Sequence, residues 1–281
     1  MKMSQKGVPT LLEFLSQDVQ PHDIIAFDGQ TMNAQFVLDL EEVLEDVEHD
    51  IECIDLLDEF WTQRPAMSCQ KAYIYDLKYN GLSAHEKIEI IQEYMKENNC
   101  TSHIVTPLDD IAWIFNLRGG DIPCSPTALA FALITLDQSY LYLQKEAYDQ
   151  SMVDAYLQEQ VIIKDYYQIY QDVMKLEGSV LLNNYELFNL ISCDIVNGMN
   201  PSQAFKAIKN DVEIENTKNA HIKDGVAMTK FMYWLKKNYG KIPMDEISIS
   251  DKVAELRQQQ DLFVDLSFTT ICAFNKNAAL M

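Results

Sequence analysis

The five histidines of the chain offer little metal-binding or catalytic chemistry by their spacing. None has a second histidine two, three or four residues away, the spacing that would place two ligands on one face of a strand or helix. His85-Glu86 resembles the start of a zinc-binding helix, but Glu89 stands in the place of the second ligand histidine. The glycine patterns of dinucleotide sites, phosphate-binding loops and the hydrolase nucleophile turn are also missing. The sequence therefore assigns no catalytic residue and no metal ligand.

A turn-rich loop from Arg118 to Pro126 holds the two residues with the best claim to a binding role. Leu117-Arg118-Gly119-Gly120 ends a predicted helix on glycines, which adopt the left-handed conformation that closes many helices. This ending places Arg118 and Asp121 at an exposed turn. In one interpretation Arg118 pairs with Asp109 or Asp121 and fixes the turn. In the other, Arg118 and Asp121 lie close to a substrate or a neighbouring subunit.

The elements around this loop alternate between strand and helix from residue 67 onward. Ser83 and Glu86 form a capping box before a helix over His85–Asn98. The loop itself follows a predicted helix over Leu108–Asn116 and precedes a predicted hairpin. The hairpin strands are Ala128–Leu136 and Tyr140–Leu143, further strands are expected at His103–Thr106, Val161–Ile163, Val180–Leu182 and Ile195–Val196, and further helices at 150–158, 166–176 and 185–191. This pattern predicts an α/β domain over residues 67–200, with a mixed sheet and helices on its faces.

Residues 9–63 also alternate between predicted strands and helices, over a shorter stretch. Pro9 suits the first turn of a helix, and Thr31 suits the cap of a second one. Short strands are expected at Ile24–Phe27 and Ile51–Ile54, and a last helix through Phe60 and Trp61 is stopped by Pro65. Because so short a stretch offers few elements for a complete domain, we interpret residues 1–66 as the C-terminal part of a larger domain.

The pattern becomes helical beyond Pro201. One stripe of a long helix carries Ala220, Ala227, Phe231, Trp234 and Leu235. Asp224 falls inside the stripe, and a structural ion pair is favoured over a catalytic role for it. A second helix is expected from Ser250 through Leu256, and then a strand over Phe268–Phe274. With one strand and no closing element after it, residues 201–281 are interpreted as the incomplete start of another domain.

The charge of the chain limits its partners. Its 281 residues carry a net charge of −21, of which residues 1–66 contribute −12, residues 67–200 −10 and residues 201–281 +1. A nucleic-acid binder needs a basic surface to replace phosphate counterions, and an anionic membrane would repel this chain, so neither partner is expected. The six cysteines lie at least 16 residues apart, which is typical of core residues in a reducing compartment. The cytoplasm is the expected location.

Several stretches in the same order resemble the aminopeptidase P family of Xaa-Pro aminopeptidases. The first runs from Leu108-Asp109-Asp110-Ile111-Ala112-Trp113 through Asn116-Leu117-Arg118-Gly119 to Asp121-Ile122. The second joins Lys206–Glu215 to Asn219–Ala227, and the third joins Phe263–Ile271 to Asn277-Ala278-Ala279. The early stretch Pro9–Leu15 also fits, so the resemblance covers nearly the whole chain.

The resemblance implies a three-part organisation. Residues 1–66 would be the tail of a first creatinase-N-terminal-like domain, and residues 67–200 a complete second one with a ribonuclease-H-like mixed sheet. Residues 201–281 would begin an α+β pita-bread peptidase domain. Members of the family remove an N-terminal residue that precedes proline and use two divalent metal ions, usually manganese. The family's metal ligands lie beyond the last matching motif, so no catalytic or metal-binding role is carried over to this chain, and Asn275-Lys276 departs from the usual Gly-Pro or Gly-Ala before Asn277.

Two hypotheses about function follow. In the first, the chain is a fragment of an Xaa-Pro aminopeptidase that lacks the metal site, binds no metal and is inactive alone, and whether it counts as an enzyme is left open. In the second, it is a non-catalytic module that pairs with a full-length paralogue. Proline-containing peptides are the expected partners of the full-length enzyme, and a homo-oligomer is the expected assembly.

Overall fold

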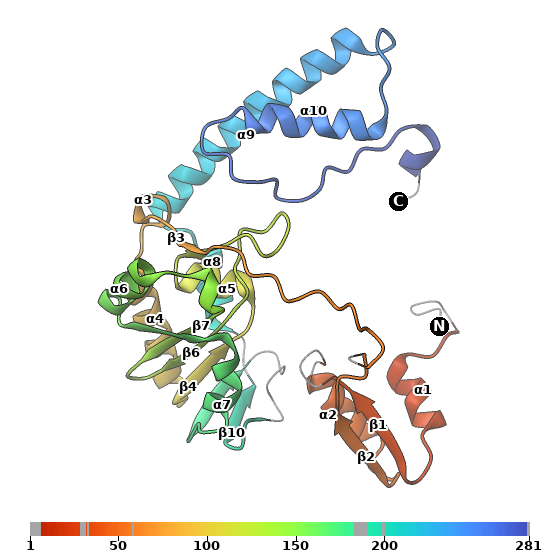
Figure 1. Cartoon of the computed structure of the whole chain (residues 1–281), viewed down its shortest axis with the longest axis vertical. Helices are drawn as coiled ribbons and strands as arrows, with labels where there is room; N and C mark the ends of the chain where they lie inside the picture. Colours follow the sequence, from red (N-terminus) through yellow and green to blue (C-terminus); the bar gives the residue numbers. More distant parts are fainter. Residues whose placement is uncertain are drawn as a thin grey trace.

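A six-stranded mixed sheet forms the core of the domain drawn at the lower left of Figure 1. The computed structural model describes residues 7–28, 32, 34–57, 59–182, 190–197 and 200–279. The strands are β4 (Ser102–Val105), β6 (Ala130–Thr135), β7 (Ser139–Leu143), β8 (Val161–Asp165), β9 (Ser179–Leu182) and β10 (Asp194–Asn197). Their order is β10-β9-β4-β6-β7-β8, and β6 runs antiparallel to both of its neighbours while the other pairs are parallel. The mixed sheet and the β6–β7 hairpin predicted from the sequence are confirmed.

Each face of this sheet has its own apolar core, because successive side chains of a strand point to opposite faces. Ala132 and Ile134 of β6 pack under α4 (Ala84–Glu97), α5 (Leu108–Ile114) and α6 (Gln150–Gln158). Phe131 and Leu133 of the same strand face the other way, toward α7 (Ile169–Val173). The central strands are therefore buried on both sides, as their almost unbroken apolar sequence indicates.

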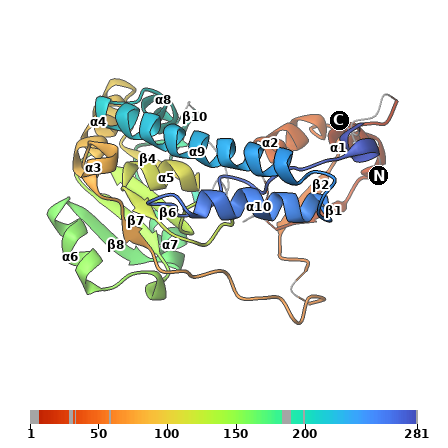
Figure 2. The same ribbon diagram turned by 90° about the horizontal axis from the view of Figure 1, so that it is seen from above.

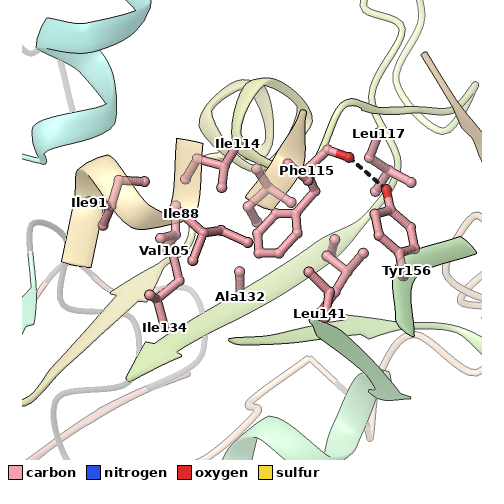
Figure 3. Packing of buried hydrophobic residues seen from close by; sticks show 14 of the residues in the cluster. Ile88, Ile91, Val105, Ile114, Phe115, Leu117, Ala132, Ile134, Leu141 and Tyr156 are labelled. Atoms are coloured by element: carbon pink, nitrogen blue, oxygen red, sulfur yellow. Dashed lines mark hydrogen bonds between the residues drawn. The ribbon is translucent and has the colours of Figure 1, made fainter. Parts of the chain in front are cut away.

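The core under α4 and α5 is closely packed (Figure 3). The ring of Phe115 lies between Ile88 and Ile114 from the helices and Leu141 from β7. The hydroxyl of Tyr156, from α6, donates a hydrogen bond of 2.8 Å to the carbonyl oxygen of Phe115. This bond satisfies a buried polar group and joins α6 to the end of α5.

The N-terminal residues form a smaller unit to one side (Figure 1). It contains α1 (Leu11–Asp18), β1 (Asp23–Phe27), α2 (Ala34–Val43) and β2 (His49–Cys53), and β1 pairs with β2 in parallel. The strand–helix–strand order is as predicted, and the predicted cap Thr31 lies outside the described residues. The expected helix through Phe60 and Trp61 is wrong: the described residues there form turns, with Phe60 exposed, since no core lies beside them. Residues 64–72 then run without regular structure to the sheet domain.

The C-terminal part is a helical hairpin (Figure 2). After α8 (Pro201–Ala207), the long helix α9 (Asp211–Asn238) packs along α10 (Glu246–Gln258). Ala227 and Phe231 of the predicted stripe are buried against α10, while Ala220 is exposed. The predicted ion pair of Asp224 is confirmed, because Arg257 Nε donates to Asp224 Oδ1 at 2.6 Å.

Two further predicted elements differ from the structure, and a third falls mostly outside the described residues. The predicted strand over Phe268–Phe274 is wrong, since these residues have no regular structure and pair with no described strand before the short helix η4 (Asn275–Ala279). The helix over 166–176 is shorter than predicted and consists of η2 (Tyr166–Gln168) followed by α7. The helix over 185–191 falls mostly outside the described residues.

Candidate functional site

The loop that carries Arg118 and Asp121 begins in a small sheet. β5 (Leu117–Arg118) pairs antiparallel with β3 (Tyr73–Ile74), a pairing that the sequence did not reveal. The left-handed residue at the end of α5 is Asn116, with φ of 51°, so the prediction that the glycines supply this conformation is wrong. Gly119 is required for space, because a Cβ there would lie 2.8 Å from the Cβ of Ala128.

Asp121 is buried and ties three segments together. Its Oδ1 accepts hydrogen bonds from Ser68 Oγ at 2.7 Å and from the backbone N–H of Gln70 at 2.8 Å. Its Oδ2 accepts one from the backbone N–H of Leu129 at 2.9 Å. With both oxygens engaged and only 9% of the residue exposed, Asp121 holds the connecting segment 64–72 against the loop. The geometry of Asp121 is that of a residue that positions the connecting segment and the loop relative to each other.

Arg118 makes no ion pair with a carboxylate of the described residues, and the predicted pairing with Asp109 or Asp121 is wrong. Its Nη1 donates to the carbonyl oxygens of Ala112 at 2.7 Å and of Leu117 at 2.8 Å. The guanidinium lies 4.4 Å from the centroid of the Tyr75 ring. A cation at the C-terminal end of a helix complements its dipole, and the ring face adds a cation–π contact. Burial lowers the pKa of Arg118, although arginine stays charged at any physiological pH.

Asp109 and Asp110 instead bind Lys206 of α8. Lys206 Nζ forms ion pairs with both carboxylates and lies 2.6 Å from Asp110 Oδ1. Burial alone would lower the pKa of Lys206, but the hydrogen bonds to the two aspartates outweigh it and raise that pKa. These contacts fasten α8 to the N-terminal end of α5.

A series of hydrogen bonds between buried polar side chains continues from Asp110 to the sheet. Asn200 Nδ2 donates to Asp110 Oδ2 at 2.6 Å, and Asn200 Oδ1 lies 3.3 Å from His103 Nε2. His103 Nδ1 lies 3.0 Å from the carbonyl oxygen of Leu181. Burial lowers the pKa of His103, which favours its neutral form. These hydrogen bonds join β4, α5 and the start of α8, so their role is structural.

The residues do not fit a two-metal centre in the part of the chain that the structure describes. No group of three or more His, Cys, Asp or Glu side chains there could hold a metal ion. Among the same residues, no helix has the length and apolarity needed to cross a bilayer.

Comparison with known proteins identifies the sheet domain. A family model described as the creatinase/prolidase N-terminal domain matches residues 63–213, which is more than half of the chain. The chain belongs to this family. The match includes the whole Asp109–Asp121 region, so the loop analysed above is part of a creatinase/prolidase N-terminal domain.

Relatives extend the similarity beyond this domain. The probable Xaa-Pro aminopeptidase P of Talaromyces stipitatus is 32% identical over 302 residues, covering 100% of this chain and 46% of that protein. Xaa-Pro aminopeptidase app-1 of Caenorhabditis elegans is 32% identical over 243 residues, covering 80% of this chain and 39% of its own length. The chain therefore spans about half the length of the curated relatives it matches, and the resemblance predicted from the sequence motifs is confirmed.

A solved structure agrees with these relatives. The crystal structure of X-prolyl aminopeptidase from Caenorhabditis elegans, a cytosolic enzyme with a di-nuclear active site, superposes with a TM-score of 0.88 at 27% identity. The superposition covers 97% of this chain and 47% of that one. The arrangement of the creatinase/prolidase N-terminal domain with its flanking segments is thus shared with that protein.

Proposed function

We propose that this chain forms the non-catalytic part and the beginning of the catalytic domain of an Xaa-Pro aminopeptidase. The observation that carries the proposal is the alignment of the entire chain, at 32% identity, with 46% of a probable Xaa-Pro aminopeptidase P. In this account the substrate class is peptides with proline in the second position. Hydrolysis would need two divalent metal ions, usually manganese, to polarise the carbonyl and generate hydroxide.

This chain's own residues would supply the frame for that chemistry. Lys206 and Asn200 fix α8 to α5, and Asn210 Nδ2 donates to the carbonyl oxygen of Asn80 at 2.7 Å at the start of α9. These bonds set the direction in which α9 leaves the sheet domain.

The proposed domain boundaries are residues 1–66, 67–200 and 201–281, and the proposed location of the protein is the cytoplasm. Arg118 and Asp121 contribute to the frame as positioning residues.

The test is a chimera. The chain through Ala279 is joined to the remaining sequence of the Caenorhabditis elegans enzyme, and release of the first residue from an Xaa-Pro peptide is measured with manganese. We expect hydrolysis by the chimera and none by the chain alone or by the added half alone. A folded, monodisperse chimera that leaves the peptide intact would contradict the proposal.

The alternative, a non-catalytic module that pairs with a full-length paralogue, is favoured by the exposed apolar residues after α10. Val264, Phe268 and Ile271 are 71%, 64% and 86% exposed. A surface of this kind marks an interface. Formation of a stable complex between the chain and an intact Xaa-Pro aminopeptidase, with no gain in activity when the chimera is made, would favour this second function.

A further inference from the structure

The first turns of α9 contact α3 (Leu77–Asn80), a helix of one turn in the creatinase/prolidase N-terminal domain (Figure 1). Asn210 Nδ2 donates to the carbonyl oxygen of Asn80 at 2.7 Å. Asn216 Nδ2 donates to the carbonyl oxygens of the two residues before Asn80, at 3.0 Å and 3.3 Å. The last carbonyl groups of a helix have no donor within that helix. Two side-chain amides of α9 supply the donors for α3.

α3 has little else to stabilise it. Leu77 is 49% exposed, and Asn80 is the one buried residue of this helix. Asp76 Oδ1 accepts from the backbone N–H of Lys78 at 3.0 Å, and the N–H of Gly81 donates to the carbonyl oxygen of Leu77 at 2.7 Å. Helices much longer than one turn are already marginal in water when isolated. The stability of α3 therefore depends on the amides of α9.

Gly81 shows how closely the two helices approach each other. It ends α3 in the left-handed conformation, with φ of 77°. A Cβ there would lie 2.9 Å from Asn210 Oδ1 and 3.0 Å from the Cβ of Val212, so a side chain at this position would displace α9 residues. Asn210 serves both helices, because its Oδ1 accepts from the N–H of Glu213 at 2.9 Å as the N-cap of α9 while its Nδ2 binds α3.

α3 is also joined to the small sheet that carries Arg118. Asn80 Nδ2 donates to the carbonyl oxygen of Tyr75, directly after β3, at 3.3 Å. The N–H of Tyr75 donates to the carbonyl oxygen of Asn116, directly before β5, at 2.6 Å. Lys87 of α4 donates to Asn116 Oδ1 at 2.5 Å, and burial lowers the pKa of Lys87 to about 8. Hydrogen bonds thus connect α9 through α3 to the residues that flank β3 and β5.

We propose that α3 couples the position of α9 to the pairing of β3 with β5. While Asn210 and Asn216 bind it, α3 is formed and β3 is held against β5. When α9 moves away, α3 unwinds, and the small sheet and Arg118 become mobile together. The coupling acts in both directions, because a coupling free energy is shared by the two sites. The inference concerns the joint between the sheet domain and the helical hairpin and does not rest on the peptidase function proposed above.

Hydrogen exchange of the whole chain, resolved to single amides by NMR, tests the coupling. Asn216→Ala removes a donor to α3 but favours α9, since alanine has the higher helix propensity. We expect the amides of Tyr75 and Gly81 to exchange about tenfold faster in this variant, and those of residues 130–143 at an unchanged rate. Unchanged exchange at Gly81 would overturn the proposal. Faster exchange at Gly81 with none at Tyr75, or equal acceleration in residues 130–143, would also overturn it.

Asn238→Ala is the matched control at the far end of α9. Asn238 Nδ2 donates to the carbonyl oxygen of Trp234, four residues earlier, at 2.7 Å. Asn216 Nδ2 makes the same kind of bond to Val212 at 3.0 Å in addition to its bonds to α3. Asn238→Ala should therefore leave the amides of α3 and β3 unchanged, and an effect equal to that of Asn216→Ala would contradict the proposal.

Two further variants test each direction of the coupling. Asn210→Ser keeps a good cap for α9 and lacks the amide that donates to Asn80, so Gly81 and Tyr75 should again exchange faster. Gly81→Ala disturbs α3 and should accelerate exchange in residues 214–216 of α9. Circular dichroism must show each variant folded, and Asn210→Ser decides the matter if Asn216→Ala unfolds. Parent-like exchange of residues 214–216 in folded Gly81→Ala would contradict the coupling.

Discussion

The sheet domain and the segment that follows it contain the same kinds of apolar side chain in opposite surroundings. Ile134 in β6 is completely buried between α4 and its neighbouring strands, whereas Ile271 is 86% exposed. Ile134 lies in a paired strand, whereas Ile271 lies in a stretch without regular structure. Ile134 has helices and strands of its own domain to pack against, while Ile271 has no such cover among the described residues. Apolar sequence therefore creates structure only where a complementary surface is available.

The largest expected effect compares these two isoleucines directly. Ile134→Ala should lower the free energy of unfolding by about 2–5 kcal/mol, because it leaves a cavity in a packed core. Ile271→Ala should change it by no more than about 0.5 kcal/mol, since that side chain is 86% exposed. Urea denaturation followed by circular dichroism measures both. Comparable losses in the two variants would contradict the contrast between the regions.

Lys87 gives the next largest effect, and its sign depends on pH. Its pKa is about 8 in the folded chain against 10.5 as the ordinary value, so above pH 8 the folded state loses this proton before the unfolded state does. Stability contributed by this group should therefore rise with pH, by about 2–3 kcal/mol between pH 7.5 and pH 10. Lys87→Met lacks this group. The free energy of unfolding of the parent chain minus that of Lys87→Met should thus increase as pH rises, and a difference that stays constant would contradict the assignment.

Asp121→Ala tests whether the connecting segment is held by a single carboxylate. Removal of its acceptors leaves Ser68 Oγ and the N–H groups of Gln70 and Leu129 unpaired, which should cost about 1–3 kcal/mol. Trypsin should then cut after Lys71 sooner than in the parent chain. Asp137→Ala, in the β6–β7 turn, is the control and should leave that cleavage rate unchanged.

The smallest effect is expected in the helical hairpin. Arg257 and Asp224 pair with side-chain exposures of 28% and 47%, so solvent screens much of their attraction. Arg257→Gln should therefore lower the free energy of unfolding by less than about 1 kcal/mol. Added salt should reduce the difference in stability between the variant and the parent chain further. A loss as large as that of Ile134→Ala would show that the hairpin depends on this pair more than its exposure allows.

The sheet domain could be predicted because its local signals agree with each other. Ser83 and Glu86 form the predicted capping box, and the nearly continuous burial of residues 130–135 follows from the unbroken apolar sequence of a central strand. The stretch Phe268–Phe274 has an equally suitable composition but no strand beside it, so local pattern alone misled the prediction. The helix predicted through Phe60 and Trp61 was wrong for the same reason, because no packed surface lies beside it among the described residues.

The candidate site was harder to predict, because its contacts join distant segments. Arg118 could be singled out by its glycine-rich turn, but its acceptors are backbone carbonyls, which carry no sequence signal. Asp121 binds the backbone of residues 70 and 129, which the chain brings together only after the sheet has formed. Lys87 did leave a signal, as a charged residue beside Ile88 on the apolar face of a helix, and this pattern could have identified it.

Hydrogen exchange followed by mass spectrometry tests the contrast between the regions most directly. In a verified monomer, the amides of residues 130–143 should exchange slowest, those of α9 beside α10 at an intermediate rate, and those of residues 262–274 within the first time point. This order follows from the burial of each region and from the absence of strand pairing in described residues 262–274. Protection of residues 262–274 equal to that of residues 130–143 would contradict the account.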